Sequence, residues 1–154
     1  MQPISAANTG AIQLFTGSPP DEFTEIVTGL ERAVGEEVAD GLPGRQWSLP
    51  LADRVLLVAV YYRTDATVRQ LGAMFGVTRP AAGRVLARLG PLLALQPLPQ
   101  RRMRIEKVLI TPEGVAFVTD DARAGKGRAE APGAILLNVD TGTRLVLRVP
   151  VPQD

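Results

Sequence analysis

Three arginines recur within one short segment, at positions 79, 84 and 88 of GVTRPAAGRVLARL. A guanidinium group is permanently charged and presents its N–H donors in a rigid fork. That fork matches the O6 and N7 acceptors of guanine in the major groove of DNA, and also the oxygens of a phosphate. The chemistry that this segment could perform is therefore recognition of nucleic acid.

The residues before the arginines fit the turn of a helix-turn-helix. A first helix is expected over about 66–75, with Asp65 as its cap. Gly76 then lies where the turn needs a left-handed residue, because glycine has no Cβ to clash at positive φ. Gly72 is small where the two helices approach, and Val77 is the apolar residue that follows the turn. This order predicts two short helices packed across one another.

The second helix of the pair carries the arginines and is expected over about 78–96. Thr78 is a good N-cap, and Pro80 lacks only an N–H that the first helical turn leaves unpaired in any case. Pro91 can split or end this helix. Its inward positions are apolar, so its outward face, together with the start of the first helix, gives the candidate DNA contacts. These are Thr78, Arg79, Pro80, Gly83, Arg84, Arg88, Arg69 and Gln70.

The expected roles differ along this surface. The N-terminal end of the second helix is the end that enters the major groove, so Arg79 and Arg84 are expected to read bases. Arg88 is a turn further on and suits phosphate, while Arg69 and Gln70 could reach the DNA backbone. Two short helices around a glycine are also common in proteins that bind no DNA, so a purely structural pair is the alternative.

The net charge of the chain is +1, but it is unevenly distributed. Residues 1–50 hold seven acids and two bases, residues 51–107 three acids and ten bases, and residues 108–154 six acids and five bases. The three net charges are therefore −5, +7 and −1. A positive segment favours phosphate binding, because displaced counterions supply most of the non-specific affinity for DNA. A solvated basic face is the alternative explanation.

The absence of cysteine and histidine excludes several kinds of site. There are no disulfides and no thiolate metal ligands, and neither a Ser-His-Asp triad nor imidazole-bound zinc can form. Any enzyme here would have to use carboxylates, lysine, tyrosine or serine. No apolar run approaches the ~20 residues of a membrane span, and the N-terminus lacks the basic start of a signal peptide, so a soluble cytoplasmic protein is expected.

The first hundred residues otherwise indicate helices. Residues 1–17 show no period and are expected to form a flexible arm or one short strand. A helix is predicted over 19–39, behind Ser18 as N-cap, because its apolar residues recur at three- and four-residue spacing. It is interpreted either as a helix packed on its own chain or as a docking helix. The run over 50–63 is apolar nearly all round, which predicts the central buried helix of a small bundle.

Beyond about residue 97 the apolar period changes to two, which indicates strands. Two hairpins are expected, one turning at 112–114 and one at 140–143, with a loop over 121–133 between them. Helices followed by strands predict an α+β fold: a helical bundle that contains the helix-turn-helix, then a small antiparallel sheet. The expected division is an arm over 1–17, a DNA-binding domain over 18–97 and a small β domain over 98–154.

The segment LPLADRVLLVAVYYRTDATVRQLGAMFGVTRPAAGRVLARLGPLL resembles the N-terminal helix-turn-helix domain of bacterial DDE-type insertion-sequence transposases. That family begins the domain with leucine-proline and a "DR-LLL" helix, followed by "T-RQLA-LFGVS" and a recognition helix. The resemblance covers about residues 47–96. It implies that Thr78, Arg79, Gly83 and Arg84 occupy groove-facing positions.

The resemblance continues into the strands. In that family a ribonuclease-H-like domain follows, and its first strand ends in a metal-binding aspartate. Here Thr111, Pro112 and Glu113 occupy that position, and the chain ends before two further acidic ligands. Two-metal phosphoryl transfer needs several converging carboxylates. The resemblance therefore implies a transposase-derived DNA binder that has lost catalysis, so we expect no enzymatic activity, no metal and no cofactor.

Together these observations predict a sequence-specific double-stranded DNA-binding protein, a nucleoid-associated transcriptional regulator that reads the major groove with helix 78–90. A homodimer is expected because one recognition helix covers few base pairs, and either helix 19–39 or the sheet could form the dimer surface. The alternative is a protein-docking adaptor that works through the helical bundle or an exposed sheet edge and binds no DNA.

Overall fold

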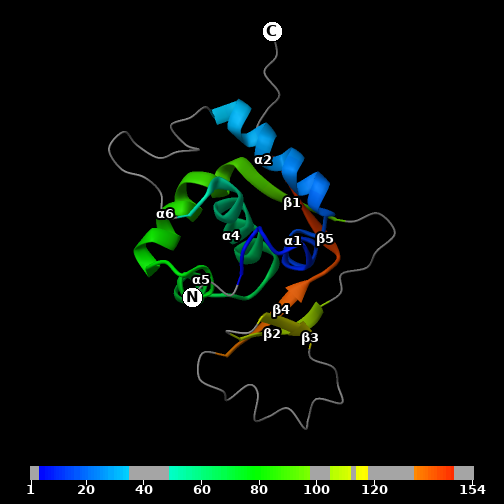
Figure 1. Cartoon of the computed structure of the whole chain (residues 1–154), viewed down its shortest axis with the longest axis vertical. Coiled ribbons are helices and arrows are strands. Elements are labelled where there is room, and N and C mark those ends of the chain that lie inside the picture. The colour runs from blue at the N-terminus through cyan, green and yellow to red at the C-terminus, as the bar shows by residue number, and fades with distance from the viewer. Residues whose placement is uncertain (1–3, 35–48, 98–104, 112–113, 118–133, 148–154) are drawn as a thin grey trace.

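The structure of the chain is a computed structural model that describes residues 4–34, 49–97, 105–111, 114–117 and 134–147 (Figure 1). Helix α4, Leu51–Arg63, lies at its centre. Ten of its 13 residues are buried, and it contacts four other helices and one strand. This confirms the prediction of a central buried helix over 50–63.

The N-terminal segment is helical, so the prediction of a flexible arm or a short strand over 1–17 is wrong. Helix α1, Thr9–Thr16, is capped by Asn8 and ends at Gly17, which is left-handed with φ 77°. Ile12 and Phe15 are buried in the core. An eight-residue helix is too short to show a clear helical period, so a short apolar run of this kind reads equally well as a strand.

Helix α2, Pro20–Val34, begins one residue later than predicted, and its predicted end at 39 lies outside the described residues. Phe23 and Leu30 are buried, and the helix packs against α1 and α4. Its inward face therefore belongs to the core of its own chain, as one of the two interpretations held. Its use as a dimer surface stays a prediction.

The two helices of the helix-turn-helix are α5, Val68–Phe75, and α6, Arg79–Leu89. The prediction of a helix through residue 96 is wrong at its C-terminal end. A 3₁₀ turn follows over Gly90–Leu92, and Leu93–Pro97 is strand β1. Pro91 gives the physical reason, because it has no N–H to donate and its ring clashes with the preceding helical turn.

The strands form two antiparallel sheets. Strand β2, Ile105–Thr111, pairs with β3, Gly114–Phe117, which confirms the first hairpin, although residues 112–113 and the loop over 121–133 lie outside the described part of the chain. Strand β4, Ile135–Asp140, pairs with the other edge of β2, whereas β5, Thr143–Leu147, pairs with β1. The prediction that the last two strands form a hairpin with each other is therefore wrong.

The bend between β4 and β5 carries the chain from one sheet to the other. The Gly142 N–H donates to Asp140 Oδ1 at 2.9 Å, which tightens the bend. The end of α1 lies directly against it, since a Cβ at Gly17 would be 2.3 Å from the carbonyl oxygen of Thr143. From α4, Arg63 Nε donates to Thr143 Oγ1 at 3.3 Å. These contacts direct β5 away from β4 and towards β1.

One hydrophobic core joins the helices and the strands, and both sheets contribute to it. The α+β class is thereby confirmed. The division between 18–97 and 98–154 stays a prediction, although β1 from the first range pairs with β5 from the second. Among the described residues, no helix is both long enough and apolar enough to cross a bilayer.

Within the helix-turn-helix, two backbone segments come close at Gly72, where a Cβ would be 2.7 Å from the carbonyl oxygen of Val77. We expect Gly72→Ala to lower the free energy of unfolding by about 1–3 kcal/mol, because the turn must move to admit a methyl group. Gly83→Ala is the matched control, since a Cβ there meets nothing within 4 Å, and alanine should add up to about 1 kcal/mol in a helix. Urea unfolding measures both variants. Equal stability of the two would contradict the close approach.

Candidate nucleic-acid interface

Hydrogen bonds fix both the start of α5 and the turn between α5 and α6. At the start of α5, Thr67 Oγ1 accepts from the Gln70 N–H at 3.1 Å, and Gln70 Oε1 accepts from the Thr67 N–H at 2.9 Å, which is a capping box. Gly76 ends α5 with φ 70°, which confirms the predicted left-handed glycine. The Val77 N–H then donates to the carbonyl of Gly72 at 2.9 Å.

The prediction that Asp65 caps α5 is wrong. Thr67 is the N-cap, and the Asp65 carboxylate accepts two hydrogen bonds from Asn138 of β4 instead. The spacing from Thr67 to Gln70 matches the capping-box pattern, so the true start of the helix could have been found from the sequence. The partner at Asn138 could not, because it lies 73 residues away along the chain.

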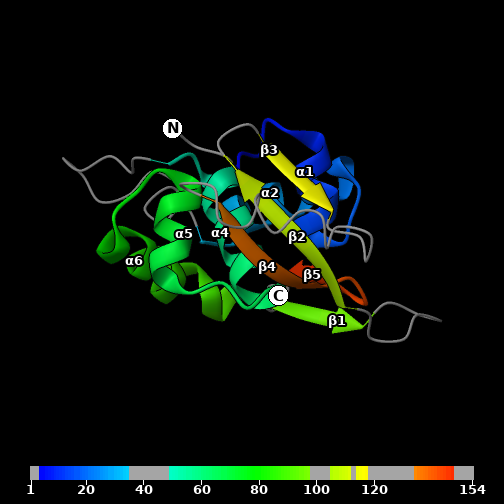
Figure 2. The ribbon, with the colours of Figure 1, turned by 90° about the horizontal axis from the view of Figure 1, so that it is seen from below.

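Helix α6 begins at the residue after Thr78, whose Oγ1 accepts from a backbone N–H three residues on at 3.2 Å. This confirms the predicted N-cap, with Pro80 in the first turn. Ala82, Val85 and Leu89 are buried, so this face of α6 packs inward. The opposite face lies at an outer edge of the molecule (Figures 1 and 2).

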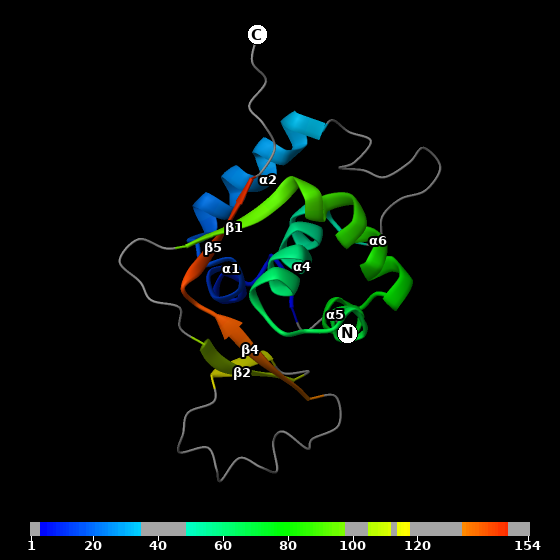
Figure 3. The ribbon, with the colours of Figure 1, turned by 180° about the vertical axis from the view of Figure 1, so that it is seen from behind.

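The C-terminal end of α6 is also held. The Tyr62 hydroxyl of α4 donates to the carbonyl of Gly90 at 2.6 Å. Strand β1 follows the short 3₁₀ turn and pairs with β5 across the molecule, as the view from behind shows (Figure 3). The candidate recognition helix is therefore fixed at its start by the turn and at its end by the sheet.

Most of the predicted contact residues are exposed: Thr78, Arg79, Pro80, Arg84, Arg88 and Arg69. Gly83 is half-buried but opens onto free space. Gln70 is half-buried, and its Oε1 already serves the capping box. Contact of these residues with DNA stays a prediction.

The exposed arginines of α6 lie along two lines. Arg84 and Arg88 are four residues apart, so they lie nearly above one another on the helix surface. Arg79 is about 140° round the axis from Arg84, at 3.6 residues per turn, and shares its line with Gly83. The structure thus brings Arg84 and Arg88 together, and it places Arg79 at the leading end of the helix on its other exposed side.

Part of the positive charge of residues 51–107 is used inside the molecule. Arg54 and Arg63 of α4 are each only 2% exposed. Arg54 Nε donates to the carbonyl of Leu49 at 3.1 Å, and Arg63 Nη1 donates to the carbonyl of Leu14 at 2.5 Å. These two guanidinium groups anchor the chain and cannot contribute to a DNA-facing surface.

Burial lowers the pKa of Arg63 to about 10, and the neighbouring Asp140 carboxylate opposes this shift. The group is therefore still a cation at pH 7. Between Asp65 and Glu106, a stretch that contains the helix-turn-helix, the sequence has no acidic residue, and four of its described arginines have exposed guanidinium groups. Those groups belong to Arg69, Arg79, Arg84 and Arg88.

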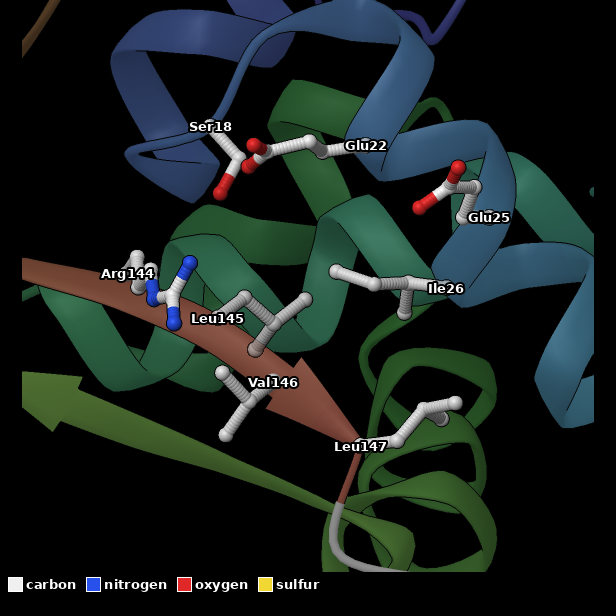
Figure 4. A pocket seen from close by; sticks show the side chains of 8 residues that line it. All are labelled: Ser18, Glu22, Glu25, Ile26, Arg144, Leu145, Val146 and Leu147. Carbon is white, nitrogen blue, oxygen red and sulfur yellow. The ribbon is translucent and has the colours of Figure 1, made fainter.

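A concave surface lies between α2 and β5 (Figure 4). It has a volume of about 370 Å³ and combines charged with apolar walls. Glu22 and Glu25 line it from α2, and Arg144 and Leu147 line it from β5. Arg144 is held by Gln96 on β1, whose Oε1 accepts from Nε at 3.2 Å and from Nη2 at 2.9 Å. This groove is the surface that the docking alternative would use.

Residues 47–99, which contain α4, α5, α6 and β1, match the family described as the helix-turn-helix of DDE superfamily endonuclease. This segment is similar to the helix-turn-helix of transposases. The chain is also 40% identical over 153 residues to a protein of Streptomyces albus G named as a transposase for insertion sequence element IS112. That match covers 97% of the chain but only 57% of the length of the Streptomyces protein. No solved structure matches the chain.

The family match confirms the resemblance and extends it slightly beyond the predicted 47–96. The matched segment thus includes the buried α4 and the strand that follows α6. Among the residues that the structure describes, no group of three histidine, cysteine, aspartate or glutamate side chains could hold a metal ion.

The buried and exposed arginines of this domain should respond differently to substitution. We expect Arg63→Ala to lower the free energy of unfolding by about 2–4 kcal/mol, because it removes the donor that satisfies the carbonyl of Leu14 and the hydroxyl of Thr143. Arg84→Ala removes an exposed side chain and should change stability by less than about 0.5 kcal/mol. Chemical denaturation of the two variants measures the difference. A negligible effect at Arg63 would show that its guanidinium is not an anchor.

Proposed function

We propose that this transposase helix-turn-helix binds double-stranded DNA with the N-terminal end of α6 in the major groove. The observation that carries the proposal is the exposure of Arg79 and Arg84 on a helix whose opposite face is buried. The family match supports it, because a helix-turn-helix presents its second helix to the major groove. The lack of carboxylates between Asp65 and Glu106 adds electrostatic support.

The residues of this surface are proposed to make different kinds of contact with DNA. Arg79 and Arg84 read base edges near the leading end of α6, where the open space at Gly83 permits close approach to the groove wall. Arg88 and Arg69 contact phosphates and fix the orientation of the helix on the duplex. The capping box uses only Oε1 of Gln70, so the NH₂ group of that side chain can also donate to a phosphate.

We also propose that the protein is a nucleoid-associated transcriptional regulator and not a nuclease. The chain spans 57% of the length of the Streptomyces protein, so the activity of that whole protein is not part of this proposal. Support for the absence of cleavage comes from the sequence, which has Thr111, Pro112 and Glu113 where the resemblance expects the first metal-binding aspartate. Of these positions, 112–113 lie outside the described residues.

A homodimer forms part of this proposal, because a single recognition helix covers few base pairs and two are needed for a longer site. Among the described strands, β3 is the last in the order β3-β2-β4, and its outer edge is the one proposed to pair with a second copy. Two copies of α6 would then lie about 34 Å apart, one turn of the duplex. The mass of the complex formed on the preferred duplex should correspond to two chains per site. A complex with one chain would contradict the dimer.

The base-reading assignment predicts the behaviour of Arg79→Ala/Arg84→Ala. Against a duplex selected from a random pool by the unmodified chain, the double variant should lose at least about tenfold in affinity and bind selected and scrambled duplexes equally, since each bidentate base contact contributes about 1–3 kcal/mol. Regulation of a reporter that carries the selected site should be lost together with this preference for the selected duplex. Fluorescence anisotropy measures the affinities.

The matched control is Arg32→Ala/Lys107→Ala, which removes two exposed cations from α2 and β2 outside the interface. This control should retain discrimination between selected and scrambled duplexes. If instead Arg79→Ala/Arg84→Ala still prefers the selected duplex as strongly as the unmodified chain, α6 does not read bases.

The groove between α2 and β5 favours a second candidate function, that of a protein-docking adaptor. The salt dependence of the affinity for duplex DNA distinguishes a DNA-binding protein from a protein-docking adaptor. If phosphates are bound, the affinity for duplex DNA should fall steeply between about 50 and 200 mM salt. Failure to bind any duplex at low salt would support the adaptor instead.

A further inference from the structure

The connection between α4 and α5 is four residues long, and hydrogen bonds hold it in place. Thr64 Oγ1 donates to the carbonyl of Val60 at 2.6 Å and accepts from the Ala66 N–H at 3.1 Å. Thr64 also forms an isolated antiparallel bridge with Val139 of β4. The last residue of the connection, Thr67, is fixed by its capping box.

Asp65 and Asn138 form the centre of this connection. The backbone N–H and the side-chain NH₂ of Asn138 donate to the two carboxylate oxygens of Asp65, at 2.9 and 2.8 Å. The Asp65 N–H donates back to the carbonyl of Asn138 at 3.3 Å. Three hydrogen bonds thus join one exposed residue of the helix-turn-helix to one exposed residue of the three-stranded sheet.

The path from this pair to the candidate interface is short. Two residues after Asp65 comes the N-cap Thr67, and two residues after that comes the exposed Arg69 in the first turn of α5. Because the Ala66 N–H and the Thr67 N–H between them are both hydrogen-bonded, the position of Arg69 depends on where β4 holds Asp65.

We propose that Asp65 and Asn138 are a positioning pair that sets Arg69 for contact with a DNA phosphate. This inference rests on the proposed function and deepens it, because it gives the sheet a part in DNA affinity. The pair touches no DNA. It acts through α5: the hydrogen bonds to β4 set the position of Asp65, and this sets the position of the start of α5.

The charge of Asp65 and its positioning role predict opposite effects of its removal on DNA affinity. Asp65 carries an exposed negative charge close to a phosphate-binding surface, so if it acted only through charge, its removal would strengthen DNA binding. If it acts by position, loss of its hydrogen bonds weakens binding although a repulsive charge has also gone. The sign of the change therefore separates the two explanations.

The experiment compares Asp65→Ala, Asp65→Asn, Arg69→Ala and Asp65→Ala/Arg69→Ala in the full chain. Asparagine at 65 removes the charge but keeps both side-chain hydrogen bonds once the Asn138 amide flips, so it is the conservative control. Affinity for the selected duplex is measured as a function of salt, at a temperature where thermal unfolding shows every variant to be folded. A purely structural role would lower the melting temperature of Asp65→Ala and leave its affinity unchanged.

We expect Asp65→Ala to bind about five- to tenfold more weakly than the unmodified chain and Asp65→Asn to bind within about twofold of it. The slope of log affinity against log salt should become shallower by about 0.9 in both Asp65→Ala and Arg69→Ala, the value for one lost phosphate contact. The double variant should bind no more weakly than Arg69→Ala, because both changes remove the same contact.

Three results would overturn the inference. Unchanged or tighter binding by Asp65→Ala, or additive losses in the double variant, would reject the positioning role while leaving the proposed function intact. Failure of the unmodified chain to bind duplex DNA at low salt would reject the proposed function, and the inference with it.

Discussion

Helix α4 is apolar over nearly its whole surface, and the fold follows from the need to remove that surface from water. Its six consecutive residues Val55–Val60 are fully buried, which a single partner helix cannot achieve. Helices on several sides and a strand are required, and the chain supplies them from the segments before and after α4. The two helices of the DNA-binding motif are among these covering elements, so their placement is set by the hydrophobic core before any ligand is involved.

The sequence was most informative where structure is determined locally. Gly76 and Thr78 act through their own conformations and nearest N–H groups, so the turn and the start of α6 were predicted correctly. It was least informative where distant residues decide. The chain after Asp140 turns away from β4 because the end of α1 and the Arg63 side chain contact the bend between β4 and β5. Those contacts join residues far apart in the sequence, so no short-range pattern predicts them.

The arginines illustrate the same limit within the candidate site. Arg54 and Arg63 lie in a basic segment like the others, yet each ends among backbone carbonyls instead of in solvent. Charge counted along the sequence therefore overstated the positive surface. Amphipathic periodicity located the outward face of α6 correctly, whereas α4 has no polar face from which the burial of its arginines could have been inferred.

Helix α6 is attached at both ends: to α5 through a glycine turn, and to the sheet through β1 and the Tyr62 hydroxyl. Its backbone is thus already ordered in the unliganded molecule, and association with a partner would immobilise little more than side chains. Such preorganisation reduces the entropic cost of complex formation. In the proposed complex, a duplex whose groove does not fit α6 would itself have to deform, so the stiffness of the DNA would contribute to the binding free energy.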